Sequence, residues 1–70
     1  MMPLSMMNTG ILKKIVKISG RDKTKKFLES LGFVEGAEVT VVSELAGNLI
    51  VNVKNSRVAL DKAMASRIFV

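Results

Sequence analysis

Reactive side chains are scarce in this sequence, and the scarcity limits the chemistry that the chain can perform. It contains no cysteine, no histidine and no tyrosine, so the commonest general base and the strongest side-chain nucleophile are both missing. A serine nucleophile would need a lysine partner, and no spacing in the chain indicates such a pair. No glycine-rich loop of the phosphate-binding types is present. We therefore expect a protein that is not an enzyme and that needs no cofactor.

Possible metal ligands are present but are not spaced as a metal cage. Six carboxylates are scattered along the chain, and only Glu35 and Glu38, which flank a predicted turn, form a pair that could hold a hard cation weakly. A solvated turn is the simpler interpretation of that pair. The N-terminal methionines suit soft ions such as Cu(I) rather than Fe(II), and a role as flexible apolar filler explains them better. We predict no metal site.

Basic side chains are concentrated in one part of the chain. Eleven Lys and Arg against six Asp and Glu give a formal net charge of +5, and only Asp22 opposes the basic residues between positions 13 and 26. Such a local positive field favours an acidic protein, a phosphate backbone or an anionic lipid surface. A solvated face that only aids solubility is an equally good interpretation. The basic residues of this stretch are Lys13, Lys14, Lys17, Arg21, Lys23, Lys25 and Lys26.

Nucleic-acid binding, as in a transcription-linked module, is the alternative function. Proteins that bind single strands interleave aromatic and basic side chains so that bases can stack. The basic stretch from 13 to 26 contains no aromatic residue, and Phe27 and Phe33 are better explained as core residues. This alternative predicts binding that weakens steeply as salt is added.

The elements that must carry these residues can be predicted from apolar periodicity. Seventy residues make a single domain, 1–70. A helix is predicted over residues 21–31, because Thr24, Phe27, Leu28 and Leu31 recur at spacings of three and four. Gly32 follows in the position where a left-handed residue ends a helix.

Alternation of apolar and polar residues predicts a mainly β fold around this helix. The first strand has an irregularity at Ile15 that indicates a bulge or a strand partly covered on both faces. Tight turns are expected at 45–48 and 55–56, and Asp61 is placed to cap a single helical turn over 61–65. Short strands joined in this way can close into a small SH3-like five-stranded barrel with one inserted α-helix. The predicted strands are 11–18, 37–44, 49–54, 57–60 and 66–70.

Glycines and aliphatic residues recur along the whole chain in a specific joint order. They are Pro3-Leu4-Ser5, Gly10, Ile15, Ile18, Gly20, Leu28, Leu31-Gly32-Phe33, Gly36, Gly47, Val51, Val53, Ala59-Leu60, Ala65 and Ile68. In this order and spacing, the sequence resembles the FeoA family of small proteins linked to bacterial ferrous iron transport. Glu35 departs from the pattern, because the family often has proline before the turn glycine, and we expect a less rigid turn here.

The resemblance implies a cytoplasmic accessory protein that binds and regulates FeoB, a membrane transporter with a cytoplasmic GTPase domain. It also implies that the partner, rather than this chain, handles the iron. The fold is similar to the C-terminal domain of iron-dependent repressors, so the fold alone does not decide the function. No apolar run approaches the ~20 residues of a membrane span, and we expect any membrane role to go through the partner.

The leading function is therefore that of a protein-binding module. We expect its contact surface in a groove between the helix and the barrel, where apolar residues leave area uncovered and basic residues form the rim. A fully buried place in the core is the competing interpretation of each apolar residue. The apolar residues are Phe33, Val34, Leu45 and Met64, and the rim residues are Lys25, Lys26 and Arg57.

Overall fold

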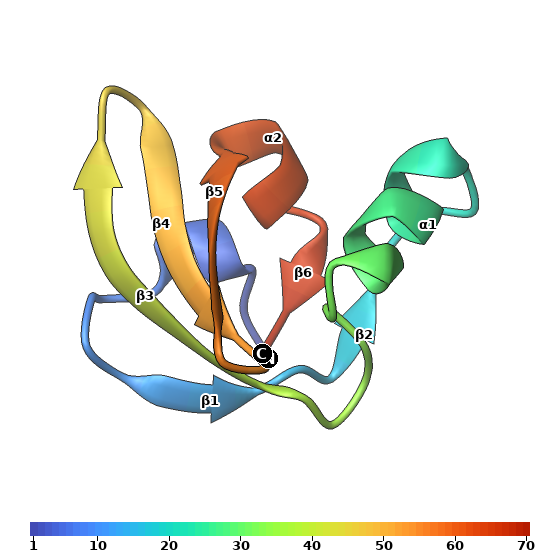
Figure 1. Ribbon diagram of the computed structural model, residues 1–70. Helices are drawn as coiled ribbons and strands as arrows, with labels where there is room; N and C mark the ends of the chain where they lie inside the picture. Colours follow the sequence, from blue (N-terminus) through green and yellow to red (C-terminus); the bar gives the residue numbers. More distant parts are fainter.

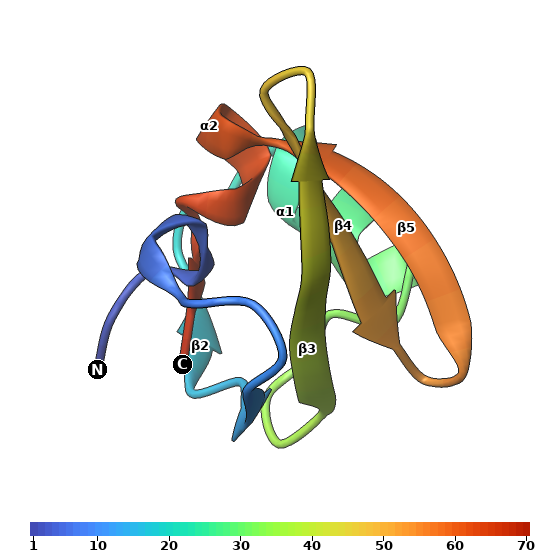
Figure 2. The ribbon, with the colours of Figure 1, turned by 90° about the vertical axis from the view of Figure 1, so that its left-hand side faces the viewer.

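Two antiparallel sheets and two short helices make up the computed structural model, which describes residues 1–70 (Figure 1). Four strands form one sheet in the order β1-β3-β4-β5, and β2 and β6 form the other. Figure 2 shows β3, β4 and β5 in the foreground, with α1 behind them. The elements are a 3-10 turn η1 (Leu4–Met6), β1 (Leu12–Lys14), β2 (Lys17–Ile18), α1 (Lys23–Ser30), β3 (Glu38–Leu45), β4 (Asn48–Val53), β5 (Ser56–Asp61), α2 (Lys62–Ala65) and β6 (Ile68–Phe69).

The first predicted strand, 11–18, is divided between the two sheets. β1 pairs with β3, whereas β2 pairs with β6. At the break, the amide of Ile15 donates to the Ala37 carbonyl at 2.9 Å and the amide of Val16 donates to the Phe69 carbonyl at 2.7 Å. The irregularity at Ile15 is therefore a change of pairing partner, and not a bulge or a strand covered on both faces. This change raises the number of strands from the expected five to six.

The N-terminal segment extends the smaller sheet. Pro3 forms an isolated antiparallel bridge with Phe69, and the amides of Met2 and Val70 each donate to the carbonyl of the other, at 3.0 and 2.9 Å. The two ends of the chain are thus hydrogen-bonded to each other. Leu4, which follows, has no exposed area and is part of the core.

Helix α1 lies where it is predicted, although it is shorter than 21–31. The Asp22 carboxylate caps it by accepting a hydrogen bond from the Lys25 amide at 3.3 Å. Gly32, just beyond its end, has a φ of 107°, which is the left-handed backbone expected there. Leu28 is fully buried, but Phe27 is 49% exposed. The interpretation of Phe27 as a core residue is therefore wrong, because Leu28 takes the inward position beside it.

The core lies between the four-stranded sheet and the segments that cover its inner face. Val39, Val41, Val51 and Val53 are at most 1% exposed, as strand alternation predicts, and no polar or charged residue is buried. The remaining large buried side chains come from other elements and include Phe33, Leu4, Leu28, Leu60 and Ile68. Every element except β1 therefore contributes to a single core made of apolar side chains.

Two tight turns connect β3, β4 and β5. Ala46 and Gly47 have positive φ angles in the first turn, which lies within the predicted 45–48. Lys54 and Asn55 have positive φ angles in the second, so this turn lies one residue earlier than the predicted 55–56. Asp61 caps α2 as predicted, because its carboxylate accepts a hydrogen bond from the Met64 amide at 2.8 Å. Neither helix has the length and apolar character needed to cross a membrane.

Candidate protein-binding surfaces

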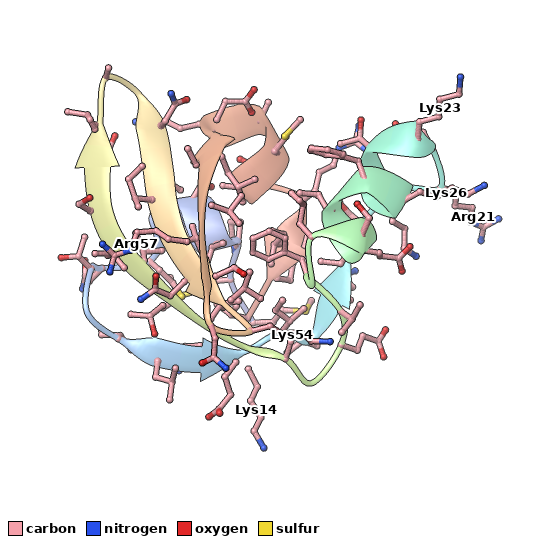
Figure 3. All side chains as sticks on the ribbon, in the orientation of Figure 1. Lys14, Arg21, Lys23, Lys26, Lys54 and Arg57 are labelled. Carbon is pink, nitrogen blue, oxygen red and sulfur yellow. The ribbon has the colours of Figure 1, made fainter.

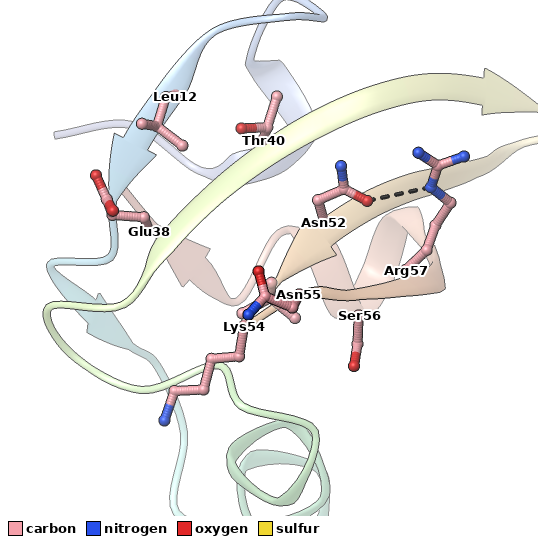
Figure 4. A pocket seen from close by; sticks show the side chains of 9 residues that line it. Leu12, Glu38, Thr40, Asn52, Lys54, Asn55, Ser56 and Arg57 are labelled. Carbon is pink, nitrogen blue, oxygen red and sulfur yellow. Dashed lines mark hydrogen bonds between the residues drawn. The ribbon is translucent and has the colours of Figure 1, made fainter.

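The outer face of the four-stranded sheet presents a row of side chains that crosses all four strands. Leu12 lies opposite Thr40, Thr40 opposite Asn52, and Asn52 opposite Arg57. These residues alternate with the buried valines, so they lie on the side of the sheet away from the core. The Arg57 Nε donates a hydrogen bond to Asn52 Oδ1 at 3.1 Å (Figure 4). This bond holds the guanidinium over the sheet and leaves its terminal nitrogens available to another molecule.

An open groove of about 620 Å³ lies along this row. Its lining combines the apolar Leu12 with the polar Thr40 and Asn52 and the charged Glu38, Lys54 and Arg57. Small-molecule sites are usually enclosed and mostly apolar. An open groove of mixed character is better suited to a segment of another protein.

Of the predicted contact residues, the structure brings Leu45 and Arg57 to this outer face. Asn48, Ile50 and Asn52 alternate along β4 on the outer side, and Leu45 lies opposite Asn48 while Arg57 lies opposite Asn52. Leu45 is 69% exposed. One face of the sheet thus presents an exposed aliphatic side chain near one end and a fixed arginine near the other.

Phe33 is not available to a partner. Its side chain has no exposed area, and its amide donates to the Leu28 carbonyl at 3.1 Å. The prediction that Phe33 leaves apolar area uncovered is therefore wrong, because the ring fills the core beside Leu28, where α1 docks. For the same reason the predicted groove between helix and barrel does not form, and the groove that the structure has lies on the sheet.

The other predicted residues lie away from the sheet groove. Lys25 and Lys26 belong to α1, and Figure 3 shows Lys26 and Arg57 on opposite sides of the molecule. Val34 and Met64 are half-buried, and Met64 packs against the core. The structure therefore divides the predicted set into an outer-sheet group and a group on or near α1.

Two of the polar contacts that the sequence analysis does not predict involve the candidate surfaces or the start of α1. One is the Asn52–Arg57 bond, which the register of a two-residue turn at 54–55 would have indicated, since that turn places 52 opposite 57. The other is an ion pair at 2.6 Å between Arg67 Nη1 and Asp22 Oδ1. It ties the start of α1 to the segment before β6. The hydrogen bond from Arg67 lowers the pKa of Asp22, and the carboxylate in turn raises the pKa of Arg67.

A family model for the FeoA domain matches residues 2–70. The chain belongs to the FeoA family. Membership supports a role in ferrous iron transport, in a family of accessory transport proteins. The structure brings no group of three or more Asp or Glu together as a metal site. No curated protein matches the chain.

Solved structures of FeoA proteins share the fold. An iron uptake regulatory protein (FeoA) is 34% identical to this FeoA-family chain, with a TM-score of 0.86 over 96% of this chain and 89% of that one. FeoA from Stenotrophomonas maltophilia, solved in complex with zinc, is 29% identical, with a TM-score of 0.89 over 100% of this chain and 89% of that one. That protein is described as a prokaryotic SH3 domain protein, and the predicted SH3-like class is confirmed.

A manganese-dependent transcriptional repressor has the same fold within a longer chain. It is 24% identical, with a TM-score of 0.86 over 97% of this chain and 39% of the repressor. At this level of identity the likeness concerns the fold alone, so it gives no support to a role in transcription.

Proposed function

We propose that this FeoA-family protein is a cytoplasmic accessory and regulatory protein of ferrous iron transport that acts by binding the cytoplasmic part of an FeoB-like transporter. The observation that carries the proposal is the family match over residues 2–70. The side chains suit a protein that acts by contact, since the chain lacks histidine, cysteine and tyrosine. In this proposal the transporter, with its GTPase domain, handles the iron.

The outer face of the four-stranded sheet is the contact surface that we favour. Arg57 is held by Asn52 at 3.1 Å, so little side-chain entropy is lost when a partner carboxylate meets it. Leu12, at the β1 end of the same row, and Leu45, at the end of β3, are 59% and 69% exposed and supply apolar area on the same face. Buried apolar or arginine anchors within a polar rim are typical of the energetically important part of an interface.

A second candidate surface contains the remaining predicted residues, which are Lys25, Lys26, Val34 and Met64. It offers less apolar area, because Val34 and Met64 are already half-buried in the free protein. The two surfaces can be separated by a pair of double variants with the same change in net charge. They are Leu45→Asp with Arg57→Ala on the sheet, and Val34→Asp with Met64→Asp near α1.

The test is a calorimetric titration of the cytoplasmic part of the transporter from the same organism with each folded protein. We expect the wild type to bind and the sheet variant to bind at least about tenfold more weakly, since two interface anchors are lost. The variant near α1 should bind like the wild type, after circular dichroism has shown that it is folded. The absence of wild-type binding would refute the partner, whereas weakening only in the variant near α1 would refute the sheet surface.

A further inference from the structure

Helix α1 turns one face fully toward solvent. Lys23, Lys26, Phe27 and Ser30 follow one another at the spacing of a single helical face, and all four are exposed. Leu28, on the opposite side, is fully buried and anchors the helix to the core. The outward face thus consists of two lysines, an aromatic ring and a hydroxyl, and no other part of the protein covers it.

The cations of this face are not neutralised within the protein. The ion pairs in the structure are Lys62 with Glu44 and Arg67 with Asp22, so Lys23 and Lys26 have no carboxylate partner. Arg21, just before the helix, is also exposed and without an ion pair. Asp22, the acidic residue among them, already forms an ion pair with Arg67, with 2.6 Å between Oδ1 and Nη1. A positive field therefore projects from the start of α1.

Phe27 adds an exposed apolar side chain to this basic face. Its ring is 49% exposed, whereas Phe33 has no exposed area, so the core does not require Phe27 to be aromatic. Lysine side chains have long apolar stems that lie along an apolar surface while the ammonium group reaches polar partners. Interfacial helices on a bilayer place aromatic rings among the headgroups and cations at the phosphates. The outward face of α1 offers this combination on a small scale, with one ring between two lysines, because Leu28 is used by the core.

We propose that the outward face of α1, formed by Arg21, Lys23, Lys26 and Phe27, docks on an anionic phospholipid surface. Two features favour lipid over an acidic protein or a nucleic acid. Protein interfaces are depleted in lysine and enriched in arginine, whereas lysine predominates here and suits mobile phosphates that offer no fixed fork geometry. Nucleic-acid platforms stack successive bases on several aromatic side chains, and this face has one.

The arrangement of the molecule allows docking and partner binding together. Figure 3 shows Arg21, Lys23 and Lys26 at one side of the molecule and Arg57 at the other. With α1 on the membrane, the outer face of the sheet remains accessible to a protein. The docking itself requires no transporter, and it revises the expectation that any membrane role goes through the partner.

The test is co-sedimentation of the full chain with phosphatidylcholine vesicles, with or without about one third phosphatidylglycerol, at low and raised salt. We expect binding to the anionic vesicles only, and release by salt because the exposed charges become screened. Lys23→Glu with Lys26→Glu should weaken partitioning at least about tenfold, since each basic residue near an anionic surface contributes roughly fivefold. Phe27→Ala should weaken it severalfold without changing the charge.

The matched control is Lys13→Glu with Lys14→Glu, which changes the net charge equally at two exposed positions on β1. It should partition markedly better than the α1 variant. Equal losses in the two variants would show that net charge, and not the helix face, attracts the protein, and would overturn the proposal. Failure of the wild type to bind anionic vesicles at low salt would also overturn it, as would retardation of DNA by the same face without vesicle binding.

Discussion

Strand β4 buries every second side chain, Leu49, Val51 and Val53, whereas α1 buries only Leu28 completely. The sheet is therefore stabilised by many contacts distributed over its length. The helix depends on one fully buried side chain and on the partly buried Leu31 at its C-terminal cap. It also depends on the Asp22–Arg67 ion pair at its start and on the chain reversal at Gly32. An element held at so few points keeps most of its surface for other molecules, and α1 accordingly carries the outward basic face.

The largest expected effect concerns the single anchor. Leu28→Ala should lower the free energy of unfolding by about 2 to 5 kcal/mol, because it leaves a cavity where α1 docks. Phe27→Ala, one position away and half-exposed, should lower it by only about 1 kcal/mol, because half of the ring is already in solvent. Urea denaturation followed by far-UV circular dichroism measures both. Similar losses in the two variants would show that α1 does not depend on its one buried side chain.

The chain reversal before α1 should be the next most sensitive feature. Gly20 has a φ of 96°, and a Cβ there would lie 2.8 Å from Arg67 Nη1, whereas Gly10, with a φ of 83°, has open space around it. Gly20→Ala should cost about 1 to 2 kcal/mol through left-handed strain and through displacement of Arg67, and it should cost more than Gly10→Ala. Thermal melts of both variants measure the difference, which should shrink when Arg67 is replaced by alanine.

The ion pair at the start of α1 should give a pH dependence of known sign. Arg67 lowers the pKa of Asp22 below its usual 3.8, so the unfolded chain takes up this proton first as the pH falls. The ion pair stabilises the folded state fully above pH 3.8, the ordinary pKa of the carboxyl. This stabilisation is lost as the pH falls through the lower pKa that Asp22 has in the folded state. Melts of wild type and Asp22→Asn from about pH 6 to about pH 2 should therefore converge at the acid end. A constant difference in Tm would contradict the ion pair.

The smallest effect should come from the ion pair between β3 and α2. Glu44 and Lys62 are 3.0 Å apart, but their side chains are 49% and 60% exposed. Glu44→Gln should change the free energy of unfolding by less than about 0.5 kcal/mol, because solvent screens the pair. Urea denaturation at low and high salt measures this. A larger, salt-sensitive loss would mean that the sheet end of the molecule also depends on a single contact.

Much of the fold could be predicted because its signals are local. The helix ending before Gly32, the turn at 45–48 and the alternation along β4 each depend on residues close together in the sequence. The candidate site was less predictable. Leu45 and Arg57 do share a surface, but Phe33 belongs to the core and Phe27 to the surface. Phe27 lies in α1 and Phe33 lies just after it. Both are apolar residues at positions where a core residue is plausible, and their spacing in the sequence does not tell which ring faces inward.

The sequence by itself determined the mainly β class, the position of α1, the cap at Asp61 and the membership of the FeoA family. These depend on periods of two and of three to four residues and on capping chemistry, which act within a few positions. The tertiary structure alone decided the division of 11–18 between two sheets and the pairing of Asp22 with Arg67. Both features depend on which distant segment comes to lie alongside, and no local pattern encodes that choice.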